Sequence, residues 1–204
     1  MLQGELLMFN SPRITVFSFI STFLFSLSLT ASPTPIKNLD LDRYQGTWHQ
    51  LAAIPASFQK NCIKNTTAEY SQLPDGLIKV VNSCDEKNGK TKSTEGRARI
   101  NEELGLNSTL EVTFVKLFGW IWSFGGDYWV TYINKNYDTV IVAHPDYDFG
   151  WILSKKKTVT KSEYKRLSKL LIKQGYDTCE FIMSETPKQK FKDGLSLCGL
   201  TNIK

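Results

Sequence analysis

Two short motifs in this 204-residue chain approach patterns that carry nucleotide-binding or catalytic chemistry. Gly89-Lys90-Thr91 resembles the end of a phosphate-binding loop, but Cys84 stands where such a loop has its first glycine. The segment Gly194–Gly199 resembles the sharp turn that presents a nucleophilic serine, but it is one residue too long and no histidine follows it. We therefore expect a hairpin turn at the first motif and an active site at neither.

Acid–base and metal chemistry also lack their usual groups. Asp146 and Asp148 are spaced to share one face of a strand, but an exposed pair of carboxylates in a turn is the ordinary outcome for such residues. The only histidines, His49 and His144, leave little room for a zinc site or a histidine-based catalytic centre. We predict a protein with no catalytic residues, no metal and no cofactor, and thus not an enzyme.

The four cysteines favour disulfide bonds over metal binding. They form no Cys-x-x-Cys pair, and their number is even, which suits an exported chain with two disulfides. Cys62 precedes one expected strand and Cys84 ends the next, so a hairpin would bring them together; this favours Cys62–Cys84 with Cys179–Cys198. The rival pairing ties Cys198 back to Cys62.

An apolar segment, Leu117–Phe124, stands where a polar loop between two strands is expected, and it contains Phe118, Trp120, Trp122 and Phe124. Either these side chains fold back to plug the end of a barrel, or they line a mouth that admits lipid or touches a membrane. Both interpretations make this end of the barrel apolar.

The beginning of the chain is typical of export. Residues 14–29 carry no charge and follow Arg13, and cleavage near Ala31 would remove a signal peptide of residues 1–31, with Met8 as an alternative start. Residues 32–38 would then be a linker. The nearest cysteine is Cys62, so no lipid-anchor cysteine is expected, and the protein is predicted to be soluble and periplasmic or secreted.

Charge is distributed unevenly along the chain. Residues 155–204 contain 12 Lys and Arg against 5 Asp and Glu, whereas residues 32–154 contain 12 against 14. The basic residues interleave with polar ones, as on a solvated helix face and tail, so no nucleic-acid partner is predicted.

The composition, 41% hydrophobic and 22% charged, excludes disordered and fibrous classes. Period-two alternation recurs about every ten residues with turns between, which indicates a barrel or sandwich. The expected strands are Thr47–Ile54, Thr67–Ser71, one around Ile78–Val80, Glu95–Ile100, Leu110–Lys116, Asp127–Ile133, Tyr137–Ala143 and Phe149–Ser154. Eight such strands close naturally into an antiparallel up-and-down β-barrel that holds one small ligand.

The pattern becomes helical once, from Thr160 to Gln174, and Gly175 ends it. The predicted fold is therefore an all-β, eight-stranded barrel with one C-terminal α-helix packed outside, over residues 39–185. A short strand, Thr178–Met183, leads to a polar tail, with residues 186–204 as its last part. The side chains expected to face inward and form an apolar pocket are Tyr70, Val80, Phe114, Val130 and Trp151.

Several blocks, in order, resemble the lipocalin family, specifically its branch of bacterial lipocalins and apolipoprotein D. They begin at Leu41–Trp48, where Gly46-Thr47-Trp48 matches the Gly-x-Trp signature, and continue at 54–59, 65–70, 110–112, 126–130 and 151–154. The family commonly has an arginine that stacks on this tryptophan. The matching residue here is Lys155, which can hold a cation over Trp48 but lacks the planar stacking of arginine.

The resemblance implies transport or storage of a small hydrophobic molecule, with fatty acids and lysophospholipids as the leading class. It points to Tyr70, Tyr128 and Trp151 as ligand contacts; plain core packing is the alternative for each. Lys60, Lys64 or Lys116 could meet an anionic head group. Two other functions stay open: a membrane- or partner-docking protein that uses the loop 117–124, and a lipocalin-fold isomerase of a lipid or carotenoid. A monomer or weak dimer is expected.

Overall fold

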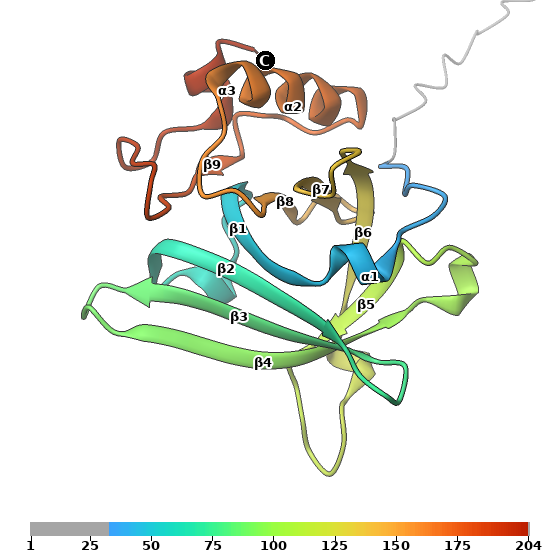
Figure 1. Ribbon diagram of the computed structural model, residues 1–204. Helices are drawn as coiled ribbons and strands as arrows, with labels where there is room; N and C mark the ends of the chain where they lie inside the picture. The colour runs from blue at the N-terminus through green and yellow to red at the C-terminus, as the bar shows by residue number, and fades with distance from the viewer. Residues whose placement is uncertain (1–32, 204) are drawn as a thin grey trace, which may run out of the picture.

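The computed structural model describes residues 33–203, which form a closed antiparallel barrel with helices along one side (Figure 1). The predicted signal peptide, residues 1–31, and its alternative start at Met8 lie outside the described residues. The barrel strands are β1 (Gly46–Ala53), β2 (Cys62–Gln72), β3 (Ile78–Glu86), β4 (Thr91–Ile100), β5 (Thr109–Thr113), β6 (Gly126–Ile133), β7 (Thr139–Ala143) and β8 (Gly150–Ser154). Each pairs with the next along the chain, which confirms the predicted up-and-down order.

Strand β1 closes the barrel, because it pairs with β8 on one side and with β2 on the other. Its first half, from Gly46 to His49, lies beside β2. Its second half, at Ala52 and Ala53, instead lies beside the short strand β9 (Ile182–Met183), which takes the place of β2 as β2 turns away.

Strands β2, β3 and β4 are longer than expected, and the additional residues are mostly polar. Alternation identified the halves whose inward side chains are apolar, such as Ile78 and Val80, which are buried. The other halves continue toward one end of the barrel, where inward positions such as Thr66 and Lys92 border a cavity rather than a core. A search for apolar alternation therefore ends each strand too early.

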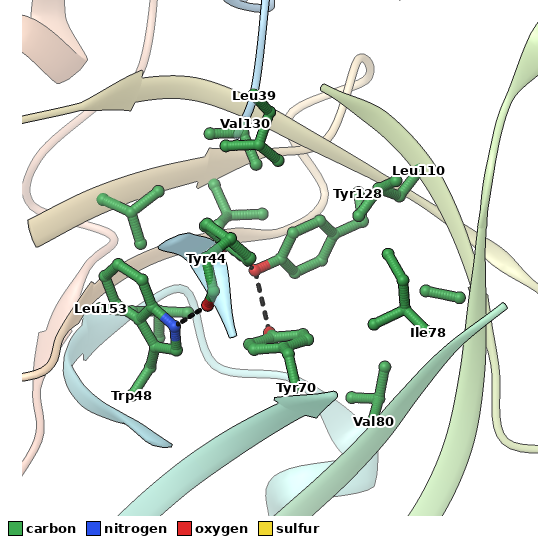
Figure 2. Packing of buried hydrophobic residues seen from close by; sticks show 13 residues of the cluster. Leu39, Tyr44, Trp48, Tyr70, Ile78, Val80, Leu110, Tyr128, Val130 and Leu153 are labelled. Carbon is green, nitrogen blue, oxygen red and sulfur yellow. Dashed lines mark hydrogen bonds between the residues drawn. The ribbon is translucent and has the colours of Figure 1, made fainter. Parts of the chain in front are cut away.

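Two clusters of buried side chains hold the elements together. One lies inside the barrel and includes Trp48, Leu110 and Val130 (Figure 2). The other lies outside the barrel, where Leu167 and Leu171 of helix α2 (Lys161–Lys173) cover Ile152 and neighbouring residues of β7 and β8. The helix packed outside the barrel is confirmed.

Helix α2 (Lys161–Lys173) begins and ends where the sequence predicts. The Thr160 side chain caps it by accepting a hydrogen bond from the Glu163 backbone N–H at 3.1 Å. Gly175, with a φ of 91°, then turns the chain after the last helical residues.

The C-terminal tail differs from the expected polar extension, because much of it packs onto the barrel and α2. It ends in a short helix, α3 (Leu197–Thr201), whose Leu197 is fully buried. The Cys179–Cys198 disulfide ties α3 to the segment that follows α2, and Thr201 of α3 lies 3.4 Å from the Ser168 hydroxyl of α2. Cys62 and Cys84 form the second disulfide, so the preferred pairing is correct and the rival is wrong.

The segment before β1 is also held to the barrel rather than acting as a free linker. The Ile36 N–H donates to the Val130 carbonyl at 2.9 Å, and the Asn107 amide exchanges two hydrogen bonds with the Leu39 backbone. A single helical turn, α1 (Leu41–Tyr44), follows and places Tyr44 inside the closed end. Within residues 33–203, no helix combines the length and apolar character that a membrane crossing requires.

Candidate ligand-binding site

The barrel contains a cavity of about 730 Å³, within the size range of small-molecule sites. Its walls come from β1, β2, β3, β4, β5, β6 and β8, and its rim from the β1–β2 connection and the β5–β6 loop. Exposed rim residues, including Phe58, Lys60 and Phe124, lie among the lining residues, so the cavity opens at this end. Trp48 and α1 close the other end.

The structure places five of the six expected pocket residues around this cavity: Tyr70, Val80, Phe114, Tyr128 and Trp151. Val130 points into the barrel as predicted but does not line the cavity, because it lies deeper along β6 in the packed cluster beside Leu39 (Figure 2). Alternation identifies the face of a strand to which a side chain belongs, but not its depth along the barrel.

Phe114 reaches the cavity rim across a glycine. A Cβ at Gly96 would stand 2.6 Å from the Phe114 ring and 2.5 Å from the Thr113 carbonyl oxygen, so the ring can lie there only because position 96 has no side chain.

The closed end is built around Trp48, which is fully buried. Its Nε1 donates to the Tyr44 carbonyl at 2.8 Å, and the Lys155 ammonium lies 5.1 Å from its ring centroid. Lys155 Nζ also donates to the carbonyls of Arg43 and Gln45, each at 2.8 Å. Lysine thus keeps the cation over the tryptophan, as expected, and also satisfies carbonyls at the end of α1.

A series of aromatic rings connects this closed end to the mouth. The distances between neighbouring ring centroids run from 5.0 Å for Tyr44–Trp48 to 6.4 Å for Tyr128–Trp151, which is typical of stabilising aromatic pairs. In order, the rings are Trp48, Tyr44, Tyr70, Tyr128, Trp151, Phe149 and Phe58. Tyr44, Phe58 and Phe149 were not predicted, because they lie outside or at the ends of the expected strands.

Three phenols meet at the bottom of the cavity. The Tyr128 hydroxyl lies 2.7 Å from that of Tyr44 and 2.9 Å from that of Tyr70 (Figure 2). Burial raises the pKa of all three phenols above the ordinary tyrosine value. The cavity bottom therefore stays uncharged, and its three hydroxyl groups are hydrogen-bonded to one another.

These raised pKa values predict a loss of stability at alkaline pH. The unfolded chain ionises its tyrosines near pH 10, whereas the folded chain keeps Tyr44, Tyr70 and Tyr128 neutral. The stability is thus intact below pH 10 and falls above it, by about 1.4 kcal/mol per pH unit for each phenol that stays neutral. Phenolate absorbance should show a cooperative step together with unfolding by circular dichroism. A smooth titration of all eight tyrosines in the folded protein would contradict this expectation.

The part of the cavity near the mouth is more polar than the part near the closed end. Adjacent inward positions on β3 and β4 place Asn82 beside Thr94 and Cys84 beside Lys92, and all four line the cavity. The Asn82 Oδ1 is buried and has no hydrogen-bond partner within the described part of the chain. Asn82, Thr94 and Lys92 thus give this part of the cavity wall a polar surface.

Lysines border the cavity on the same side. Lys60, one of the three lysines suggested from the sequence, lines the cavity, whereas Lys64 and Lys116 do not. Lys92, which was not considered, does line it. With β4 extended to Thr91, every second side chain faces the barrel interior, from Ala98 through Gly96 and Thr94 to Lys92. The alternation then identifies Lys92 as a residue that faces inward.

The apolar loop does not plug the barrel. Phe118 is fully exposed at its tip, and Phe124 at its base lines the cavity mouth. Trp120 and Trp122 are half-buried against the outer face of β4, where Arg97 and Arg99 lie over their rings. The plug is therefore wrong, and of the four aromatic residues expected at the mouth only Phe124 lines the cavity.

The motifs rejected from the sequence occupy structural positions. Gly89 forms the turn of the β3–β4 hairpin with a φ of 77°. Ser196 caps α3, and Asp146 and Asp148 are exposed in the β7–β8 turn. In the described part of the chain, no cluster of three His, Cys, Asp or Glu side chains is arranged to hold a metal ion.

Comparison with known proteins agrees with this architecture. A model of the lipocalin-like domain matches residues 39–186. Temperature-induced lipocalin-1 of Arabidopsis thaliana is 34% identical over 75% of this chain and 81% of its own length. The outer membrane lipoprotein Blc of Escherichia coli K12 is 29% identical over 82% of this chain and 94% of its own.

The fold also matches solved structures. Insecticyanin from the tobacco hornworm Manduca sexta superposes with a TM-score of 0.60 at 23% identity, covering 76% of this chain and 84% of that one. The family model, the relatives and the barrel geometry agree: this chain belongs to the lipocalin family.

Proposed function

We infer that this protein binds, and carries or stores, a small amphiphile with a hydrocarbon chain, either a fatty acid or a lysophospholipid. The observation that supports this most strongly is the 730 Å³ cavity itself, whose inner part is apolar and aromatic and whose mouth combines lysines and other polar side chains with exposed aromatic rings. Membership of the lipocalin family, whose members bind small hydrophobic ligands, supports the same conclusion.

The lower cavity suits a hydrocarbon chain. Val80, Val112 and Leu153 line it together with Tyr128 and Trp151. A hydrocarbon chain that lies there is therefore shielded from water on nearly all sides. Each buried methylene contributes about 0.8 kcal/mol, which corresponds to about fourfold in affinity. Such a wall provides affinity without much discrimination among chains.

The upper cavity suits the head group. Lys60 and Lys92 can approach a carboxylate or phosphate, and Asn82 and Thr94 supply neutral polar groups just below. Because both lysines are exposed, an anion there stays partly hydrated and its charge is not buried at great cost.

Two disulfides, together with the uncharged residues 14–29, support export to the periplasm or the extracellular space. The proposal includes no catalytic step and no nucleic-acid partner. All four cysteines are in disulfides, so a lipid isomerase based on a free thiol has no nucleophile here. We expect the protein to work as a monomer or weak dimer.

Calorimetric titration with saturated fatty acids of increasing length tests the proposal. Affinity should rise by up to about fourfold for each methylene from decanoate to tetradecanoate. Lys60→Gln/Lys92→Gln should weaken fatty-acid binding several-fold but leave the matching fatty alcohols unaffected. Lys161→Gln/Lys165→Gln on α2 removes the same charge far from the mouth and serves as the control. Absence of saturable binding for every chain length would contradict the proposal.

A further inference from the structure

The β5–β6 hairpin, Val115–Ile121, carries apolar side chains away from the barrel that its own structure does not cover. Phe118 is fully exposed at the tip, and Leu117 beside it is 64% exposed. Figure 1 shows this segment extending beyond the strands that it connects. Contiguous exposed apolar side chains on a protein commonly mark a surface that contacts a partner or a membrane.

Backbone hydrogen bonds give this hairpin a defined conformation. The Ile121 N–H donates to the Val115 carbonyl and the Leu117 N–H to the Gly119 carbonyl, both at 2.9 Å. Phe118 has a φ of 53°, a backbone conformation that side-chain-bearing residues seldom adopt. The turn thus holds the Phe118 ring in water. Packing the ring against the barrel would be more favourable for the hydrophobic effect alone.

Cation–π contacts fasten the base of the hairpin to the outer wall of the barrel. The Arg97 guanidinium lies 4.7 Å from the Trp120 ring centroid, and Lys116 approaches the same ring at 5.3 Å. Arg99 lies 4.3 Å from the centroid of Trp122. Two indoles are therefore held at the height where the hairpin leaves the barrel, and the tip projects beyond them.

The same end of the molecule contains the cavity mouth and further exposed aromatic rings. Phe124, just after the hairpin, lines the mouth and is 69% exposed, and Phe58, which also lines the cavity, is 59% exposed. A planar apolar partner that accepted the hairpin tip would therefore also face the opening of the cavity.

Charge identifies the partner. Lys116 adjoins the tip, and Lys60, Lys64 and Lys92 lie at the same end; within residues 33–203 none of the four has a carboxylate within 4 Å. The carboxylates beside the hairpin base, Glu95 and Glu111, are instead engaged by Arg97 and Arg99. The acidic residues Asp146 and Asp148 belong to the β7–β8 turn. Asp127 also lines the cavity, where it stands against the two lysines Lys60 and Lys92. The mouth therefore keeps an excess of positive charge that can face anions.

We propose that the hairpin Val115–Ile121 is a membrane-docking element, which inserts Leu117 and Phe118 into the surface of an anionic bilayer. Trp120 and Trp122 then lie near the headgroup level, where indoles are favoured, and Lys116 meets lipid phosphates. The cavity mouth faces the bilayer, so an amphiphile could pass between membrane and barrel without crossing bulk water. This docking does not depend on the ligand proposed above.

Vesicle co-sedimentation tests the docking. Wild-type protein is expected to partition onto phosphatidylcholine vesicles that contain phosphatidylglycerol, and Leu117→Ser/Phe118→Ser should lower the partition coefficient by about tenfold or more. Lys116→Gln should weaken binding to the anionic vesicles and leave the weaker binding to pure phosphatidylcholine unchanged. Because the tip contacts little of the barrel, these variants should keep the wild-type thermal unfolding midpoint.

The matched control is Leu104→Ser. Leu104 ends the 3₁₀ turn Glu102–Leu104 between β4 and β5, is 45% exposed, and lies at the closed end of the barrel. This variant should partition as the wild type does. Equal partitioning of the tip variant and wild type, or no partitioning of the wild type, would overturn the proposal. Sedimentation-equilibrium analysis that shows a wild-type dimer abolished by the tip substitutions, without vesicle binding, would assign the surface to a second copy instead.

Fatty-acid titration of the tip variant separates the two proposals. Unchanged oleate affinity with lost vesicle binding supports docking and ligand binding as distinct properties. Vesicle binding by a wild type that takes up no oleate would contradict the ligand-binding proposal alone.

Discussion

Replacement of Ala68 by tryptophan is expected to lower the affinity for oleate by at least about tenfold. Ala68 lies on β2, where it lines the cavity beside Asn82 and one inward position above Tyr70. An indole at this position occupies space that the ligand chain would fill. Loss of contact with only about two methylenes accounts for a tenfold change. Calorimetric titration of the variant measures it directly.

Glu69→Trp provides the matched control. Glu69 is the next residue on the same strand, and it is exposed on the outer face of the barrel. The same indole there should leave oleate affinity unchanged. If both variants bound oleate as the wild type does, the ligand would not occupy this cavity.

Replacement of Trp48 by alanine is expected to have the largest effect on stability, a loss of about 3–5 kcal/mol in the free energy of unfolding. The indole is fully buried, its centroid lies 5.0 Å from that of Tyr44, and its Nε1 donates to the Tyr44 carbonyl. Its removal leaves a cavity at the closed end and takes away the ring under the Lys155 ammonium. Denaturant unfolding with both disulfides intact provides the measurement.

Two further variants show whether the loss of stability depends on the ring and on its position in the closed end. Trp48→Phe keeps a ring in the closed end and should retain a larger part of the stability than alanine does. Trp122→Ala removes an indole of the same size from the outer surface and should cost about 1 kcal/mol or less. A loss below about 1 kcal/mol for Trp48→Ala would show that the closed end does not depend on the Gly-x-Trp tryptophan.

Much of the barrel could be predicted because its determinants are local in sequence. Alternation identified the inward faces of β3 and β5 through Ile78, Val80 and Leu110, and Gly175 marked the end of α2. The hairpin of β2 and β3 brings Cys62 and Cys84 together, so that disulfide followed from the strand order.

Features that depend on depth or on distant segments could not be predicted in this way. Val130 faces the barrel interior as predicted but lies too far toward the closed end to line the cavity. Lys92 belongs to the first part of β4, which was not predicted as strand because its residues are polar. The tail is mostly polar in sequence, but its few apolar residues pack α3 against α2, and the Cys179–Cys198 disulfide holds it there. Nothing local indicated that Arg97 and Arg99 would hold Trp120 and Trp122 on the outer wall.

The most direct test of a ligand in the barrel is mass spectrometry of the exported protein, first under native and then under denaturing conditions. Our account predicts an additional mass that is lost on denaturation and is recovered in the organic extract as a fatty acid or lysophospholipid. The Ala68→Trp variant should carry much less of it. A protein that is empty as isolated and takes up neither class of lipid when these are added would contradict the account.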